Sequence, residues 1–559
     1  MVQPSLGAII SSVLLGSIGG FDSSPAPVAN LTGIGQHRGT RLSKSISGFN
    51  LANPVDAWLG IDYALQPVGD RRFAPVEQPP ERFDGVRDAT RFGPICTQDK
   101  SYEYAGEQSE ACLNFNVYRP AGVPLTQKLP TLVWIHGGAF SLYSGRTMDG
   151  GSFVASSDQP VMVVTFNYRL NSLGFLPSGL FERLGLLNLG LRDQHFFLQF
   201  LQTHLPAFGG DPAQITLGGL SAGAHSAAFQ YFHNYGADEG APLFARAILQ
   251  SGAVTARAFP DVSHPRYEAD FRTLMQHVSC DADADDEQQL ACLRAAPIEE
   301  IERVSSRIYA EAESSLSWPW QPVPGAPRME RRGSRVLRQR SFHRLPLITT
   351  HTTDEGKYYT PGHLQTNDEF LRFWQALSPG LNVTDLAILN ELYPDPAAHP
   401  DSRWARGSPN GTQYDRLSAA WSDMAYICPS RATAEATGGE TWRLRFDTPG
   451  HPLEASGWRG VPHASDAAYL WNEPGVPFPE VAREYHAYMA SFVAAGEPNK
   501  FRGEGAPEWP RYGGSEGARG GCAQQLVVSP GRTGTECDDV RVRHCAFWND
   551  EERAGRLQK

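Results

Sequence analysis

The sequence of 559 residues lacks an excess of positive charge. Lys and Arg number 49 against 61 Asp and Glu, which gives a formal net charge of −12 at pH 7. Proteins that bind nucleic acid neutralise phosphates with clustered basic side chains, and the chain carries no basic tail. The arginine-rich stretch 328–344 has the composition of a solvated face. We therefore expect no nucleic-acid partner.

Metal-binding spacings are also missing. The cysteines form neither a CxxC nor a Cys/His arrangement suited to zinc, so we predict no metal site. Their even number favours disulfides instead. The eight are Cys96, Cys112, Cys280, Cys292, Cys428, Cys522, Cys537 and Cys545.

The apolar run from Leu6 to Gly20 is too short to span a bilayer, and we expect no membrane span. Its length and small-residue ending are typical of a signal peptide. No Lys or Arg precedes it, so a buried helix or a loosely docked arm is the alternative. We expect residues 1–20 to be a signal peptide and the protein to be secreted. Three glycosylation sequons agree with that route, at Asn30, Asn382 and Asn410.

Internal repeats and long Gly/Ser-rich or charged linkers are absent from the sequence. We expect an N-terminal extension over 21–45, one catalytic domain over 46–549 and a polar tail over 550–559. Helical patterns such as 191–205 lie between short β-branched runs. The fold is therefore predicted to be α/β, with a mostly parallel central sheet covered by helices on both faces. The β-branched runs that we expect to form strands are 131–136, 160–168, 214–219, 245–252 and 345–352.

Ser221 lies in the GxSxG motif of "GGLSAGAHS", between a predicted strand and an Ala-rich helical pattern. A sharp strand-to-helix turn at a nucleophile requires small neighbours, because the flanking backbone comes close. The helix that begins at Ala222 directs its free amides towards the serine. A bare match arises readily by chance in a chain with 55 glycines, but the strand and helix around it favour a nucleophile.

A serine nucleophile needs a base, and the base needs a carboxylate to orient it. Two later stretches supply candidates in the order acid, histidine: "TTDEGKYY" (352–359) and "GVPHASDAAYLW" (460–471). Composition alone does not choose among the 16 histidines. "WIHGGAF" (134–140) is a strand that runs into small residues, whose amides can stabilise an oxyanion.

Further motifs occur along the chain together with those above. They are, in order, "GIDYALQPVGDRRF", "EACLNFNVYRP", "WIHGGAF", "NYRLNSLGFL", "NLGLRDQ", "FGGDP", "GLSAGAHS", "ILQSG", "TDEG", "PHASD", "GEPN" and "WPRY". In this order they resemble the type-B carboxylesterase/lipase family, which includes cholinesterases and fungal lipases. The resemblance runs from about residue 60 to beyond 512 and implies an α/β-hydrolase fold.

The resemblance implies roles residue by residue. Ser221 would be the nucleophile, Glu355 the acid and His463 the base, with Asp354 as the alternative acid. Three amides would form the oxyanion hole, those of Gly138, Ala139 and Ala222.

Further residues follow from the same resemblance. Ser251 and Asp466 would form a buried hydrogen-bonded link beneath the histidine, or would serve packing alone. His136 and His225 are expected to be structural. The family also pairs four of the cysteines, Cys96 with Cys112 and Cys280 with Cys292; the pairing of the other four stays open.

The sequence departs from the family pattern at several positions. Leu220 stands where Glu is usual, which disfavours a cationic, choline-like substrate. Asp466 replaces Glu and Ala464 replaces Gly, and a small backbone adjustment should accommodate both. Ala139 is a variation that implies tolerance of bulky alcohol groups. The loop between Cys96 and Cys112 is shorter than the mobile lid of the family's lipases, which favours an esterase of soluble substrates.

We therefore expect a secreted serine carboxylesterase that hydrolyses small-molecule esters through an acyl-enzyme, without a cofactor. Three alternatives stay open: a lipase on longer acyl chains, an acyltransferase or lactone hydrolase of a biosynthetic pathway, and a non-catalytic cholinesterase-like binding module. The natural ester cannot be identified from the sequence. Trp318, Trp320 and Phe140 either line an apolar pocket or belong to the core.

Overall fold

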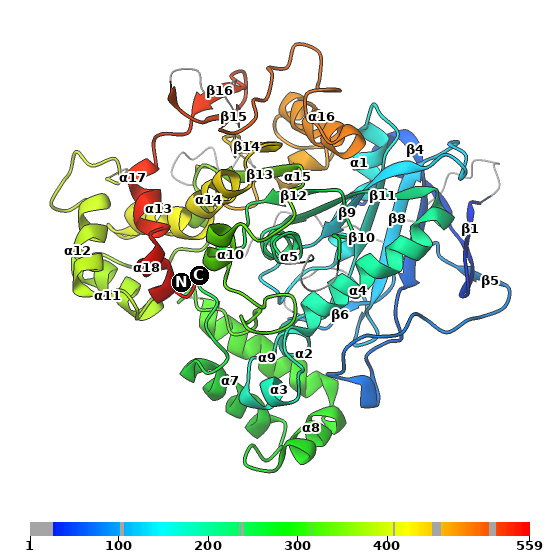
Figure 1. Cartoon of the computed structure of the whole chain (residues 1–559), viewed down its shortest axis with the longest axis horizontal. Helices are drawn as coiled ribbons and strands as arrows, with labels where there is room; N and C mark the ends of the chain where they lie inside the picture. Colours follow the sequence, from blue (N-terminus) through cyan, green and yellow to red (C-terminus); the bar gives the residue numbers. More distant parts are fainter. Residues whose placement is uncertain are drawn as a thin grey trace.

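The structure is a computed structural model that describes residues 26–100, 106–233, 235, 240–313, 315–405, 408–449, 460–513 and 521–559. The predicted signal peptide, 1–20, lies outside the described residues. An 11-stranded sheet in the order β16-β15-β14-β13-β12-β11-β9-β10-β8-β4-β3 forms the centre of the molecule (Figure 1).

The strands from β10 to β15 in that order are all paired in parallel, and the pairings beyond both ends are antiparallel. The sheet comprises β3 (Thr40–Lys44), β4 (Asn50–Asp62), β8 (Asn114–Pro120), β9 (Leu129–Ile135), β10 (Met162–Phe166), β11 (Gly210–Leu220), β12 (Arg246–Gln250), β13 (Leu347–Thr352), β14 (Thr441–Phe446), β15 (Gln524–Val528) and β16 (Gly534–Cys537). Two small sheets accompany it, made of β1 (Val28–Leu31), β2 (Gly35–Arg38) and β5 (Val86–Asp88), and of β6 (Ile95–Cys96) and β7 (Gln108–Ser109).

Helices cover both faces of the sheet. α4 and α5 pack on one face, and α1 and α16 on the other. Successive side chains alternate between the two cores, as the strand period requires: Val163 points to one and Val164 to the other. The helices that contact the sheet are α1 (Gly150–Ser156), α4 (Leu189–His204), α5 (Ala222–Tyr231), α14 (Cys428–Thr437) and α16 (Pro479–Ala495).

The remaining helices build the periphery. Figure 1 shows α7, α8 and α9 in a lobe that projects beyond the sheet. These helices are α2 (Asn171–Gly174), α3 (Gly179–Arg183), α7 (Pro265–His277), α8 (Asp286–Ala295), α9 (Ile298–Glu313), α10 (Gly333–Gln339), α11 (Asn367–Leu377), α12 (Val383–Leu392), α13 (Tyr414–Ser422), α15 (Ala467–Leu470), α17 (Val542–Trp548) and α18 (Glu551–Arg556). A short π-helix, η6 (Asp423–Ile427), joins α13 to α14.

The predicted α/β class is confirmed. The β-branched runs correspond to β9 to β13, and the helical pattern 191–205 corresponds to α4. The folded unit differs at both ends from the boundaries expected for the catalytic domain. β3 lies within the expected extension and pairs with β4 in the main sheet. α18 lies within the expected polar tail and buries Ala554.

Four disulfides cross-link the chain: Cys96–Cys112, Cys280–Cys292, Cys428–Cys545 and Cys522–Cys537. The first two are the pairs that the family resemblance implies. The third joins α14 to α17 across a sequence separation of 117, so it ties the C-terminal helices to the body of the molecule.

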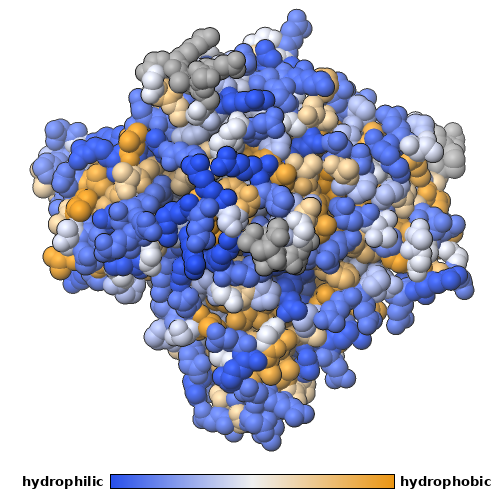
Figure 2. Space-filling view, in the orientation of Figure 1, coloured by the Kyte–Doolittle hydropathy of each residue, from blue (hydrophilic) through white to orange (hydrophobic). Residues whose placement is uncertain are grey.

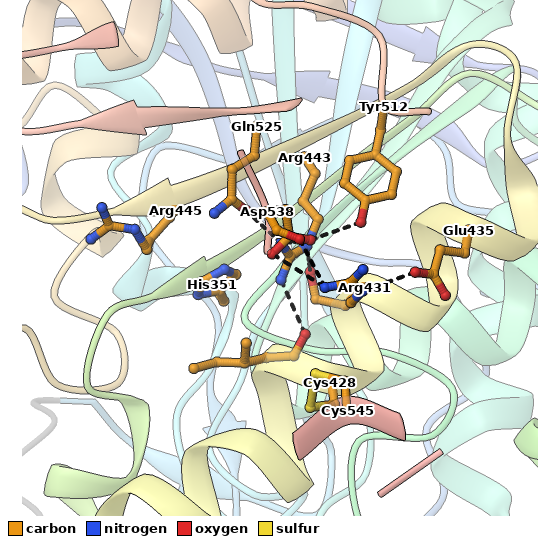
Figure 3. Close-up of polar contacts among 12 residues, drawn as sticks. His351, Cys428, Arg431, Glu435, Arg443, Arg445, Tyr512, Gln525, Asp538 and Cys545 are labelled. Atoms are coloured by element: carbon orange, nitrogen blue, oxygen red, sulfur yellow. Dashed lines mark hydrogen bonds and ion pairs between the residues drawn. A yellow bond between two sulfur atoms is a disulfide. The ribbon is translucent and has the colours of Figure 1, made fainter. Parts of the chain in front are cut away.

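A buried cluster of charged residues connects the C-terminal part of the chain to the central sheet (Figure 3). Asp538, just after β16, forms ion pairs with Arg443 of β14 and with Arg431 of α14. It also accepts a hydrogen bond from the Tyr512 hydroxyl. Arg443 is fully buried. Burial by itself would raise the pKa of Asp538, but the two arginines hold that pKa below its usual value.

The surface seen in Figure 2 is mostly hydrophilic, with apolar residues scattered among polar ones. In the described part of the chain, no helix is both long enough and apolar enough to cross a membrane. Within the same residues, no group of three or more His, Cys, Asp or Glu side chains is placed to hold a metal ion.

Candidate active site

Ser221 occupies a strained turn between β11 and α5. Its backbone has φ 58° and ψ −125°, a conformation that residues with a side chain rarely adopt. The Ser221 amide donates to the carbonyl of Gln250 at 2.9 Å, which holds the turn against the end of β12. The strain therefore coincides with the predicted nucleophile.

The two glycines of the motif are sterically required. A Cβ at Gly219 would lie 2.4 Å from the carbonyl carbon of Gly223. A Cβ at Gly223 would lie 2.0 Å from the carbonyl oxygen of Ile135. Real Cβ atoms do not approach this closely, so the turn excludes any larger residue at either position, in agreement with the steric argument from the sequence.

Glu355 follows β13 and has no exposed surface. Three donors hold its carboxylate. His463 Nδ1 donates to Oε2 at 2.5 Å, while the Ser251 hydroxyl and the Thr352 amide donate to Oε1 at 2.7 and 2.8 Å. The predicted acid and base are thus in direct contact, and the histidine ring is oriented by its Nδ1 proton.

The alternative acid, Asp354, serves another contact. Its Oδ2 accepts from the amide of Val461 at 3.1 Å, and its own amide donates to the Val461 carbonyl at 2.9 Å. Asp354 therefore fastens the segment that leads to His463, and the geometry favours Glu355 as the partner of the histidine.

The loop after β9 passes directly against Ser221. A Cβ at Gly137 would lie 3.2 Å from Ser221 Cβ. Gly138 and Ala139 both have left-handed backbones, with φ of 96° and 53°. Among the described residues, neither of their amides donates a hydrogen bond to another group. Ala222 opens α5, where helix amides have no partner within the helix.

Ser221, Ser251, Glu355 and the loop with Gly138 and Ala139 follow the carboxyl ends of parallel strands. β9, β11, β12 and β13 end next to one another, which is where open α/β sheets place their ligands. A model of the carboxylesterase family matches residues 25–536 of the chain. The chain belongs to the carboxylesterase family.

The chain is similar to several proteins of known name. It is 48% identical to Secreted lipase 4 of Gibberella zeae, over 95% of each chain. It is 29% identical to Lipase 1 of Geotrichum candidum, over 87% of this chain and 90% of the other. The crystal structure of Aspergillus niger EstA matches with a TM-score of 0.81 and 28% identity, over 96% of this chain and 99% of that one. The expected family and α/β-hydrolase fold are confirmed, and the protein is a carboxylic ester hydrolase.

Two tyrosines complete the site of this carboxylesterase. The Tyr426 and Tyr359 rings lie 4.6 and 5.2 Å from the ring of His463, measured between centroids. The Ser221 side chain acts on the pKa of both phenols, so the two hydroxyls lie near it. Burial raises the pKa of both phenols, so they remain protonated donors at neutral pH. The sequence analysis singled out neither tyrosine: Tyr359 ends the quoted stretch 352–359, whereas Tyr426 comes from the π-helix η6 and belongs to none of the quoted motifs.

The second predicted pair, Ser251 and Asp466, is only partly linked. Ser251 donates to Glu355, whereas Asp466 Oδ2 accepts from the Tyr485 hydroxyl at 3.2 Å. Among the described contacts no hydrogen bond joins Ser251 to Asp466. Asp is one methylene shorter than the Glu of the family pattern, which accounts for the gap. Burial, with the charge of Glu355 adding to it, raises the pKa of Asp466 to about 6.

The two histidines near the motifs are neutral and enclosed. His136 Nδ1 donates to the Gly137 carbonyl at 2.9 Å, and its ring stacks on Tyr168. His225 Nδ1 accepts from the amide of Ala253 at 3.3 Å. Burial lowers the pKa of His136 to about 4 and that of His225 well below its usual value. Both sets of contacts fit the structural roles expected for them.

Other sequence expectations fall outside the site. Ala464 keeps a left-handed φ of 66°, which explains why the family has glycine there. Trp320 donates its indole N–H to the Ser305 carbonyl and belongs to the core. Of the sequon asparagines, Asn30 and Asn382 are exposed, whereas the Asn410 side-chain nitrogen is buried. Residues 101–105 of the loop between Cys96 and Cys112 lie outside the described residues.

Proposed function

We propose that this carboxylesterase hydrolyses carboxylic esters through an acyl-enzyme formed on Ser221. The observation that carries the proposal is the contact of His463 with a buried, triply hydrogen-bonded Glu355 beside the strained turn of Ser221. A histidine oriented in this way has one ring nitrogen left for proton transfer. His463 Nε2 is buried and, among the described residues, has no hydrogen-bond partner.

The reaction has two steps, acylation of Ser221 and hydrolysis of the acyl-enzyme. His463 takes the Ser221 proton as the hydroxyl oxygen attacks the ester carbonyl, and then gives that proton to the departing alcohol. Water attacks the acyl-enzyme after losing a proton to the same histidine, which releases the acid and restores Ser221. Glu355 orients the ring and stabilises its charged form.

The negative charge of each tetrahedral intermediate would be held by the amides of Gly138, Ala139 and Ala222. Loss of one such donor costs about a hundred- to a thousandfold in rate in comparable sites. The Tyr359 and Tyr426 side chains, which lie against the ring of His463, would position Ser221. All of these groups belong to the chain, and the mechanism calls for no cofactor.

A lipase acting on longer acyl chains is the second candidate. The names of two relatives, Secreted lipase 4 and Lipase 1, favour it. The disulfide loop from Cys96 to Cys112 has a sequence separation of only 16, which favours soluble esters, since the lid of the family's lipases is longer. We also propose secretion, on the strength of the four disulfides and the name of the Gibberella relative.

One experiment tests the mechanism and ranks the two candidates. The purified protein and its Ser221→Ala variant are assayed with p-nitrophenyl esters from acetate to decanoate, with and without a fluorophosphonate. We expect turnover that labelling of Ser221 abolishes and that the variant lacks while it remains folded. A rate that peaks at decanoate and rises on emulsified substrate would favour the lipase, and full activity in the variant would refute the mechanism.

A further inference from the structure

A buried arginine lies beside the candidate site, and among the described residues it has no anionic partner. Arg257, in the connection between β12 and α7, is 6% exposed. Its guanidinium carbon is 4.9 Å from the ring centroid of Trp318 and 5.5 Å from that of Phe140. Phe140 directly follows Ala139 of the proposed oxyanion hole, so the cation lies among the aromatic residues for which the sequence left two roles open, an apolar pocket or the core.

Two of the three guanidinium nitrogens of Arg257 are unsatisfied. Nε and Nη2 are buried without a hydrogen-bond partner, and among the described residues no carboxylate forms an ion pair with this side chain. Two other buried arginines have a partner for every guanidinium nitrogen. Arg169 makes a bidentate pair with Asp193 and donates to the Ala74 carbonyl, and Arg416 donates from all three nitrogens. An enclosed cation without an anion is costly to a folded protein. The cost is recovered when a ligand brings the anion.

Among the described residues, no neighbouring group neutralises this charge. The ionisable groups that act on Arg257 include Tyr426 and Tyr359, which burial keeps protonated. His225 also lies near, and burial and Arg257 itself keep it neutral. The rings of the same two tyrosines lie 4.6 and 5.2 Å from the ring of His463, so the positive charge borders the groups around the candidate base.

We propose that Arg257 binds a carboxylate carried by the ester substrate. A guanidinium presents its N–H groups in a fork that matches a carboxylate, and the rings of Trp318 and Phe140 would hold the carbon chain between the carboxylate and the scissile ester. The substrate class is thus an ester that also bears a free carboxylate, on either its acyl or its alcohol part. This inference rests on the proposed function of Ser221, and the hydrolytic steps are unchanged by it.

The test compares charged and neutral members of matched substrate pairs. The acyl-side pair is mono-p-nitrophenyl adipate and its methyl ester. The alcohol-side pair is para-acetoxybenzoate and its methyl ester. For the wild type, Arg257→Met and Arg257→Lys, kcat/KM is measured for each, and the charged-to-neutral ratio is the readout. The matched control is Arg332→Met, because Arg332 is a nearby cation already paired with Asp261 at 2.6 Å.

We expect Arg257→Met to lower the ratio for one pair by about ten- to a hundredfold, the worth of a charge-assisted hydrogen bond. Arg257→Lys should restore part of it, and Arg332→Met should leave it unchanged. The pair that responds identifies the part of the ester that carries the carboxylate. Free adipate should inhibit hydrolysis of the neutral ester competitively in the wild type and much more weakly in Arg257→Met.

Two other results have distinct meanings. A ratio that is the same in the wild type and in Arg257→Met, with both proteins active on neutral esters, overturns the proposal and leaves Arg257 as a packing residue. A wild type without activity on any ester and without fluorophosphonate labelling overturns the proposed function itself. Labelling of Arg257→Met by a neutral fluorophosphonate, together with its melting temperature, shows whether the variant is folded and its serine competent.

Discussion

His463 Nδ1 lies 2.5 Å from Glu355 Oε2, and the carboxylate that accepts this hydrogen bond has no exposed surface. Ser251 and Thr352 hold the other oxygen. The carboxylate of Glu355 is therefore held in place by the fold itself, and the ring of His463 can turn only by breaking this contact. A base held in this way needs little reorganisation during the reaction.

Replacement of that acid should remove catalysis without unfolding the protein. We expect Glu355→Gln to lower kcat by about 10³- to 10⁴-fold, because an amide no longer stabilises the charged imidazole and favours the wrong tautomer. Asp354→Asn is the matched control and should change kcat by less than about tenfold, since Asp354 contacts Val461 instead. Steady-state kinetics on p-nitrophenyl acetate measures kcat for both variants. A larger loss of kcat in Asp354→Asn than in Glu355→Gln would make Asp354 the acid.

The turn at Ser221 should be intolerant of a single methyl group. Gly219→Ala places a Cβ 2.4 Å from the Gly223 carbonyl carbon, so the turn must shift. We expect a loss of about 1–3 kcal/mol in the free energy of unfolding and a large fall in activity. Gly503→Ala serves as the control, because its Cβ would meet no atom within 4 Å. Urea unfolding and esterase assays measure both effects; an active, unshifted Gly219→Ala would contradict the steric account.

The tyrosine pair should contribute through its hydroxyls alone. Tyr426→Phe and Tyr359→Phe keep the rings that lie against His463 and remove the two hydroxyls near Ser221. We expect each to lower kcat about two- to tenfold, the worth of one neutral hydrogen bond, with little change in melting temperature. Tyr488→Phe, on α16, removes a hydroxyl bonded to Pro507 and should leave kcat unchanged. Equal rates in all four proteins would remove the pair from the mechanism.

The sequence predicted most of the sheet and named the candidate catalytic residues, and the reasons lie in particular residues. β9 to β13 are β-branched runs that must be buried on both faces, and Ser221, Glu355 and His463 lie in ordered motifs. β3 and α18 were missed because they are short and polar, and only packing reveals them. Tyr426 and Arg257 were missed for a different reason. Each reaches the site from a segment without a motif, so its proximity to Ser221 is a property of the fold and not of any local pattern.

The cluster around Asp538 should make stability fall in acid. The folded pKa of Asp538 is lowered, so its contribution is complete above its unfolded value, 3.8, and is lost as the pH drops through the folded pKa. At pH 7, Asp538→Asn should cost about 3–5 kcal/mol, because Arg443 remains buried without its anion. The difference in free energy of unfolding between wild type and variant, measured by urea unfolding, should shrink below pH 3.8. A constant difference would mean that the charge of Asp538 is unimportant.

Asp466 should show the opposite pH dependence. Its folded pKa is raised from 3.8 to about 6, so the folded state binds a proton more readily than the unfolded chain. Stability should therefore fall as the pH rises from about 4 to about 6, and the ionised carboxylate should weigh against folding above that range. Asp466→Asn keeps an oxygen for the Tyr485 hydroxyl and removes the charge, so we expect it to stabilise the protein by about 1–3 kcal/mol at pH 7 and by little at pH 4. Urea unfolding of both proteins at the two pH values measures this. A variant that is less stable than the wild type at pH 7 would show that the carboxylate is ionised and paired, and that the charge beneath His463 is part of what holds the histidine in place.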